Sequence, residues 1–111
     1  MEAANVVEEK EFNDGAVKKV SRIKTDAIGQ DTYYFNDGQV LDWHRHPTGD
    51  QVFFVHEGKG KYYLDDGTEE CIDINAGCVM LAPKNVWHKI VAEGELVVSQ
   101  ATTQPAGMET R

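Results

Sequence analysis

Two histidines lie one residue apart in the stretch His44-Arg45-His46-Pro47-Thr48-Gly49-Asp50-Gln51, which has Gly38 ahead of it and Gly58 behind it. Side chains alternate between the two faces of a β-strand, so an extended chain projects both imidazoles from the same face. Two imidazoles that can contact the same ion are typical of metal ligands. The stretch therefore predicts a strand that ends in a turn and presents a candidate metal site.

The chain is short and acidic. Its 111 residues are enough for one domain that folds without disulfide bonds. The 19 acidic and 11 basic residues give a net charge of −8, and no cluster of Lys and Arg offsets it. This charge repels nucleic-acid phosphates and anionic lipids, so we expect neither nucleic acid nor a membrane as a partner.

The sequence also indicates a compartment. Cys71 and Cys78 do not form a CxxC pair, and we interpret both as buried free thiols. The chain begins Met1-Glu2-Ala3-Ala4 and stays acidic, without the basic and apolar regions of a signal peptide. The longest apolar runs, such as 78–82, are too short to span a bilayer. We therefore expect a soluble, cytoplasmic protein.

Beyond Gly29 the chain consists of short runs of β-forming residues separated by turn residues. These runs cover 31–35, 39–46, 52–56, 61–64, 69–74, 78–82, 88–91 and 96–100. Asp66-Gly67 is typical of a tight hairpin turn, and Pro83-Lys84-Asn85 ends another run. This pattern predicts an all-β fold, a double-sheet jelly roll of roughly eight or nine strands.

The two ends of the chain are expected to lie outside this barrel. Residues 1–15 are polar and acidic, and we interpret them as a solvated arm. The β-branched residues within 16–24 predict one more strand, which would begin a single barrel domain over residues 16–103. Residues 104–111 are polar and are predicted to be a flexible tail.

A third imidazole and an amide complete the candidate site. By the period of two, one strand face carries Val40, Asp42, His44 and His46, and a face of the next strand carries Gln51, Phe53 and Val55. A turn over 47–50 would set Gln51 beside the two histidines, and a barrel would bring His88 alongside from another strand. Three imidazoles and one amide oxygen suit one divalent transition metal such as Zn, Fe, Ni, Cu or Mn.

These spacings resemble the two sequence motifs of the cupins. The first cupin motif is Gly, five residues, His-x-His, three or four residues, Glu, six residues, Gly; here it reads Gly38, five residues, His44-Arg45-His46, four residues, Gln51, six residues, Gly58. The second is Gly, five residues, Pro-x-Gly, two residues, His, three residues, Asn; here it reads Gly77, five residues, Pro83-Lys84-Asn85, two residues, His88, three residues, Ala92. Asn85 can adopt the left-handed turn conformation of the usual Gly. The resemblance covers residues 30–100 and implies a double-stranded β-helix.

The resemblance also implies roles for these residues. It makes His44, His46 and His88 metal ligands and places Gln51 where cupins usually have a carboxylate ligand. A neutral Gln leaves the bound ion its full charge, which makes the ion a stronger Lewis acid. A His/His/Gln/His set resembles that of small cupins that convert unsaturated uronates, although the last strand, 96–100, lacks the Asp and Arg associated with that group. Small cupins also imply a homodimer in which an N-terminal strand, here within 11–24, pairs across the interface.

Around the metal we expect an apolar pocket. The candidate pocket residues are Phe53, Met80, Tyr33 and Asp42. Trp43 and Arg45 point to the opposite strand face by parity, and His56 lies on the face opposite Gln51. Arg22 or Lys61 would have to supply any cation at the rim.

Two functions of different classes fit these residues. The first is an enzyme of dioxygenase, isomerase or lyase type, whose metal would bind a hydroxyl or carbonyl oxygen of a small oxygenated molecule. The second is a non-catalytic module that binds a metabolite or a metal, because this fold hosts both. Replacing Glu by Gln removes a proton acceptor, so no catalytic residue is assigned. A metal-free structural barrel is the third reading.

Overall fold

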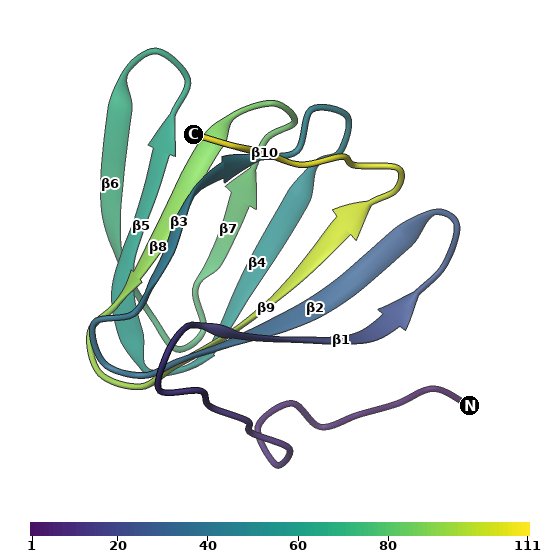
Figure 1. Ribbon diagram of the computed structural model, residues 1–111, viewed down its shortest axis with the longest axis vertical. Helices are drawn as coiled ribbons and strands as arrows, with labels where there is room; N and C mark the ends of the chain where they lie inside the picture. Colours follow the sequence, from purple (N-terminus) through teal and green to yellow (C-terminus); the bar gives the residue numbers. More distant parts are fainter.

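The computed structural model describes residues 1–111 and is built from β-strands alone (Figure 1). The strands are β1 (Lys18–Lys24), β2 (Ile28–Phe35), β3 (Val40–Arg45), β4 (Gln51–Glu57), β5 (Lys59–Asp65), β6 (Glu69–Asn75), β7 (Val79–Ala82), β8 (Trp87–Ala92), β9 (Leu96–Thr103) and β10 (Glu109–Thr110). This confirms the predicted all-β class, including the strand expected within 16–24. The structure contains no helix that could span a membrane.

Two five-stranded antiparallel sheets face each other across the core. The first sheet has the order β1-β2-β9-β4-β7, and the second has the order β10-β3-β8-β5-β6. Neighbours in each sheet come from distant parts of the chain, as when β2 pairs with β9 and β3 pairs with β8. Figure 1 shows the two sheets as opposite walls of the barrel. The predicted double-stranded β-helix is therefore confirmed.

Alternating side chains build the core between the sheets. Phe35, Phe53, Ile90 and Leu96 have no exposed surface. In β8 the inward positions are His88, Ile90 and Ala92, and the residues between them are half-buried. Each fully buried large apolar side chain contributes about 1.5–3 kcal/mol. The alternation that fills the core therefore also turns His88 inward.

A β-bulge interrupts β3 immediately before the first histidine. Val40 and Leu41 pair with Val91 and Ile90, but the register shifts so that His44 pairs with His88. Two residues of β3 thus oppose one residue of β8, which is the defining feature of a bulge. As a result Leu41 packs against the core while Val40 is exposed, so the prediction that Val40 shares the face of His44 was wrong.

Both ends of the chain pack against the barrel. The hydroxyl of Tyr34 donates to the carbonyl of Val6 at 2.7 Å, and the ring of Phe12 lies edge-on to Tyr34. Residues 104–111, predicted to be a flexible tail, cross from the first sheet to the second, where Glu109 pairs with Arg45 (Figure 1). This segment is hydrogen-bonded to the barrel, since the backbone N–H of Gln104 donates to the Ala27 carbonyl. The boundaries at residues 16 and 103 stay a prediction.

The two cysteines are free, but the prediction that they are buried was wrong. Cys71 is exposed, and Cys78 is half-buried. Cys71 lies opposite Tyr63 in the pairing of β6 with β5, and β6 is the outermost strand of the second sheet. Most residues of this edge strand are exposed, which explains why a small apolar residue here is not in the core.

The two outer glycines of the first motif should differ in their tolerance of a side chain. Both have a positive φ, 78° at Gly38 and 85° at Gly58, so alanine costs roughly 1–2 kcal/mol at either position. A Cβ at Gly58 would also lie 2.0 Å from the Glu95 carbonyl oxygen, whereas nothing lies within 4 Å at Gly38. Urea unfolding should therefore show a larger loss of stability for Gly58→Ala than for Gly38→Ala. Equal losses would contradict the close approach of Glu95.

Candidate metal centre

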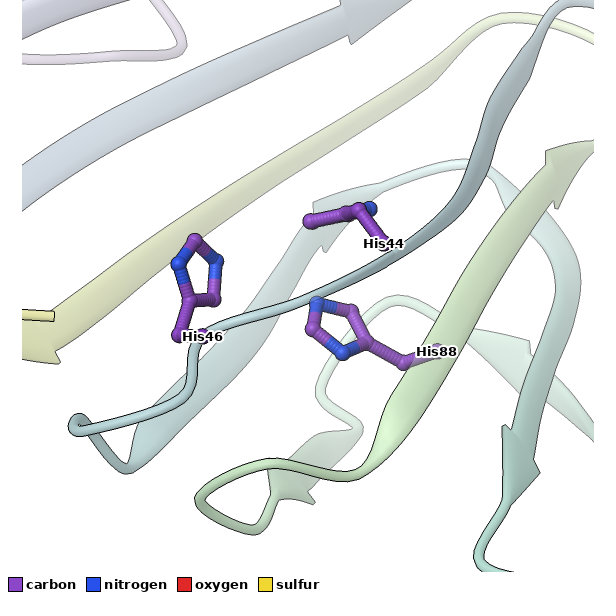
Figure 2. A group of neighbouring side chains, drawn as sticks. All are labelled: His44, His46 and His88. Carbon is purple, nitrogen blue, oxygen red and sulfur yellow. The ribbon is translucent and has the colours of Figure 1, made fainter. Parts of the chain in front are cut away.

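Strand pairing brings three imidazoles together at one end of the barrel. His44 and His88 lie opposite each other in β3 and β8, and their ring centroids are 4.1 Å apart. His46 follows the end of β3, with its ring centroid 5.4 Å from that of His44 and 5.7 Å from that of His88. Each histidine offers a ring nitrogen within 4.8 Å of the others. Figure 2 shows the three rings close together, with His88 on one strand and His46 on the loop that follows the strand of His44.

A backbone carbonyl holds the Nδ1 atom of each ring. His44 Nδ1 lies 2.8 Å from the Asp42 carbonyl, and His88 Nδ1 lies 3.1 Å from the Val86 carbonyl. His46 Nδ1 lies 2.7 Å from the carbonyl of Gly107 in the C-terminal segment. Because a carbonyl only accepts, each Nδ1 carries the proton and each Nε2 keeps its lone pair. The backbone therefore selects the tautomer that a metal needs.

Burial keeps His44 and His88 neutral. Desolvation by burial, together with the neighbouring His44, lowers the pKa of His88 from 6.5 to about 3. Burial also lowers the pKa of His44 below its usual value. Neutral imidazole is the form that ligates a metal. These two imidazoles can thus bind a cation without first losing a proton.

Gln51 provides an oxygen with no partner in the protein. It is the first residue of β4 and is 1% exposed. Its Nε2 donates to the Thr102 hydroxyl at 2.9 Å, which leaves Oε1 buried without a hydrogen bond. His46 Nε2 and His88 Nε2 are buried and unpartnered as well. A buried polar atom without a partner is rare, and neutral nitrogen and oxygen donors of this kind fit a divalent transition metal.

The loop of the second motif, 83–85, is hydrogen-bonded to the turn of the first motif, 47–50, and its neighbour His46. Asn85 adopts a φ of 64°, the left-handed conformation predicted for the position of the usual Gly. Its backbone N–H donates to the His46 carbonyl at 2.8 Å, and Lys84 N donates to an Asp50 side-chain oxygen at 2.8 Å. The turn before His88 is therefore fastened to the chain on either side of the turn after His46.

A cavity of about 710 Å³ opens beside the histidines, between the two sheets. Of the predicted pocket residues, Tyr33 and Asp42 border this cavity. Asp42 is exposed, and it is its backbone carbonyl that holds His44. Cationic side chains also border the cavity, namely Lys19, Lys24 and Arg111.

Other predicted pocket residues lie elsewhere. Phe53 is fully buried in the core, with its ring centroid 5.7 Å from that of His88. Met80 borders a separate, mainly apolar cavity of about 240 Å³. Arg22 donates to Tyr34, and Lys61 pairs with Asp73, so neither supplies the cation expected at the rim.

Several polar residues that surround the site were not predicted from the sequence. Asp31, Gln100 and Thr102 border the cavity, and Gly107 holds His46. Alternation does place Gln100 and Thr102 on one face of the last long strand. Nothing local, however, indicates that this strand lies between β2 and β4. No alternation of this kind points to Gly107, because the sequence of its segment resembles a solvated tail.

The metal-free protein should lose stability in mild acid. Folding keeps His88 neutral to a pKa of about 3, whereas the unfolded chain binds its proton near 6.5. The contribution of His88 to the free energy of unfolding is therefore complete above pH 6.5. It falls by about 1.4 kcal/mol per pH unit as the pH drops towards 3. Urea unfolding of chelator-treated protein at pH 7 and pH 5 measures the loss, and His88→Asn should reduce it. A slope that His88→Asn leaves unchanged would contradict the burial of a neutral imidazole.

Comparison with known proteins agrees with this architecture. A protein of unknown role with a double-stranded β-helix domain from Klebsiella pneumoniae is 19% identical, over 97% of this chain and 95% of that one, with a TM-score of 0.88. An RmlC-like cupin from Desulfovibrio desulfuricans is 24% identical, over 93% and 96%, with a TM-score of 0.84. KdgF from Halomonas sp. is 22% identical, over 88% and 89%, with a TM-score of 0.75. At these identities the likeness establishes the fold alone.

The family is established by sequence. No curated protein matches the chain. The family model described as "Cupin domain" matches residues 32–99, which include both motifs from His44 to His88 and more than half of the chain. The chain therefore belongs to the cupin domain family.

Proposed function

We propose that this protein binds one divalent transition metal through His44, His46, His88 and Gln51, and that it acts on a small oxygenated molecule. The observation that carries the proposal is the group of buried, unpartnered atoms at the site, which are His46 Nε2, His88 Nε2 and Gln51 Oε1. Burying polar atoms without partners costs free energy, and a metal ion would satisfy all of them at once.

The bound metal would act as a Lewis acid on a hydroxyl or carbonyl oxygen. The side chains of the cavity would bind and orient the rest of that molecule. Burial raises the pKa of the Tyr33 hydroxyl, so this group stays protonated and can donate a hydrogen bond. Lys24 borders the cavity without an ion-pair partner, whereas Lys19 lies 3.8 Å from Asp31 and Arg111 pairs with Asp65 at 2.8 Å. This combination suits a polar molecule that carries negative charge.

A non-catalytic module is the second candidate function, and the chemistry of the site supports it. Asp31 and Asp42 are the carboxylates that border the cavity. Asp31 is engaged by Lys19, Ser21 and Gln100, and Asp42 accepts from the Trp43 N–H. Neither is a free general base, and Gln51 is not one. A site that holds a metal and a metabolite without converting it is compatible with these contacts.

The proposal also includes a homodimer in the cytoplasm. β1 is the outermost strand of the first sheet, so its outer edge has no neighbour within the chain. An unpaired edge is a surface on which a strand of a second copy can pair. Both cysteines are free, which supports a reducing compartment.

Metal analysis tests the proposed site. After reconstitution and desalting, the parent protein should hold about one divalent ion per chain, as expected for a single cluster of this kind. The double substitution of His44→Ala and His46→Ala should remove it, because two of the ligands are lost. His56→Ala is the matched control, since His56 is an exposed histidine on β4. Equal metal content in the double variant and the parent would refute the assignment.

Turnover separates the enzyme from the module. The protein is reconstituted without oxygen using Fe, Mn, Ni, Cu or Zn, and oxygen uptake and ultraviolet absorbance are followed with flavonols, diketones and unsaturated uronates. For an enzyme, we expect product with one of these metals and loss of product in His88→Ala. This substitution removes a proposed ligand but does not remove the contact of His46 with Gly107 in the C-terminal segment. Tight binding without product under every metal would establish the module instead.

A further inference from the structure

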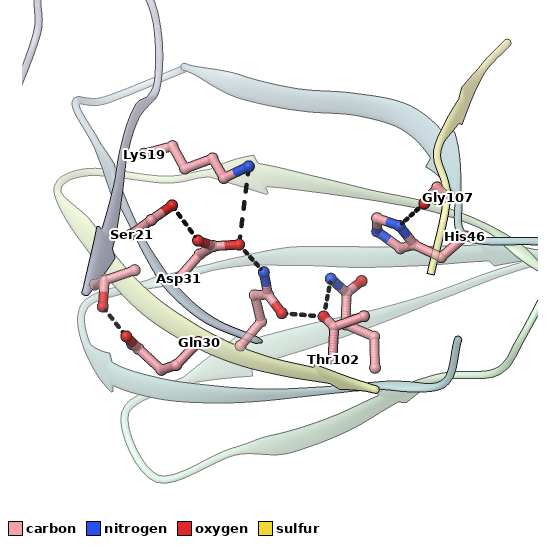
Figure 3. A network of polar contacts seen from close by, with 10 residues as sticks. Lys19, Ser21, Gln30, Asp31, His46, Thr102 and Gly107 are labelled. Atoms are coloured by element: carbon pink, nitrogen blue, oxygen red, sulfur yellow. Dashed lines mark hydrogen bonds and ion pairs between the residues drawn. The ribbon is translucent and has the colours of Figure 1, made fainter. Parts of the chain in front are cut away.

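A line of hydrogen bonds joins the edge of the cavity to Gln51 (Figure 3). Asp31 accepts from the side-chain amide of Gln100, and the carbonyl of that amide accepts from the Thr102 hydroxyl. The Thr102 oxygen in turn accepts from Gln51 Nε2 at 2.9 Å. The line therefore runs from a carboxylate, through two side chains, to the amide of the proposed metal ligand.

The chemistry of its first member sets the direction of this line. A carboxylate offers only acceptors, so Gln100 must turn its NH₂ group towards Asp31 and its oxygen towards Thr102. That oxygen accepts, so the Thr102 hydroxyl must use its single proton there. The Thr102 lone pairs then face Gln51, which has to present its NH₂ group. Oε1 of Gln51 is left on the other side of the amide, buried and unpartnered.

Burial makes this choice strict. Thr102 and Gln100 are each 3% exposed and Gln51 is 1% exposed, so a reversed amide would find few water molecules to replace its lost partner. Asp31 is itself fixed, because the Ser21 hydroxyl donates to it and Lys19 Nζ lies 3.8 Å away. Reversing the Gln51 amide would set two acceptors against each other in a dry site, at a cost of about 1–3 kcal/mol.

We propose that Asp31 is a positioning residue of the metal centre, which acts through Gln100 and Thr102 to keep the Gln51 oxygen directed at the metal. The inference rests on the proposed function, since it assigns an orientation to one of the proposed ligands. It explains how an amide can stand in the place of a carboxylate. The two oxygens of a carboxylate are equivalent, whereas an amide ligates well in only one of its two orientations.

The test compares metal affinity in variants that break the line at different points. Asp31→Asn lets the first amide pair reverse, and Thr102→Val removes the hydroxyl without changing the charge. Titration with Zn²⁺ or Co²⁺ should give a Kd weaker by about 10-fold to 100-fold in both variants, the usual effect of losing a group that orients a ligand. The absorption spectrum of the Co²⁺ form should also change, because the metal loses an oxygen ligand.

Replacing the ligand by one that needs no orientation isolates the effect. In the Gln51→Glu protein either oxygen can face the metal, so adding Asp31→Asn should leave the Kd of that protein unchanged. A purely electrostatic effect of Asp31 on the cation would persist in the Gln51→Glu protein. Asp26→Asn, which removes an exposed carboxylate from the turn between β1 and β2, controls for net charge. Thr102→Ser keeps the hydroxyl and should restore the affinity that Thr102→Val loses.

Each outcome has a separate meaning. If neither the parent nor the Gln51→Glu protein binds metal, the proposed function fails. If the parent binds metal and Asp31→Asn and Thr102→Val bind it equally well, the proposed function stands and the positioning role is overturned. Equal weakening by Asp31→Asn in both backgrounds overturns it too, in favour of simple electrostatics. If circular dichroism shows that Thr102→Val does not fold, the positioning role is still tested by comparing the effect of Asp31→Asn on the Kd in the parent and in the Gln51→Glu protein.

Discussion

The antiparallel register of β3 and β8 sets His44 directly opposite His88, and the site depends on the extra residue that produces this register. Ahead of the bulge, Leu41 pairs with Ile90, and that register continued without interruption would place Trp43 opposite His88. His44 and His46 would then face away from the barrel, because a shift of one residue moves every side chain to the other face. The bulge lets one strand supply Leu41 to the core and both imidazoles to the site.

The backbone determines the site as much as the side chains do. Three carbonyls from separate segments hold the Nδ1 atoms, at Asp42 in the bulge, at Val86 before β8 and at Gly107 near the C-terminal end. Fixing the second nitrogen of a ligating histidine orients the ring and raises its basicity. The position of His46 is thus coupled to the docking of residues 104–111, which pair with β3 through β10. A segment that resembles a tail in the sequence is part of the wall of the site.

How far the sequence predicts this protein depends on how local each feature is. Turn residues and the period of two are local, so the strands, the all-β class and the inward position of His88 are predictable. The bulge is defined only by pairing with β8, so the alternation through Val40 and Asp42 leads to a wrong face for Val40. The contact of Asp31 with Gln100 requires β2 to lie beside β9, some seventy residues apart in the chain. Met80 likewise has the right alternation for the core, but which cavity it borders depends on how the sheets close.

Because Gln51 is neutral, all four proposed ligands are uncharged in the metal-free site. Neutral imidazoles and a neutral amide can be buried beside Phe53 without a countercharge, so burial of these side chains does not require an ion. A carboxylate in place of Gln51 would carry a charge into the same dry surroundings, where desolvation opposes ionisation until a cation is present. With four neutral ligands, the proposed ion would keep its full positive charge. The natural partner for that charge would be an anionic or strongly polarised oxygen of a molecule in the cavity, whose wall includes Lys24. In the proposed function, the neutral ligand set would therefore favour a substrate with negative charge near the oxygen that binds.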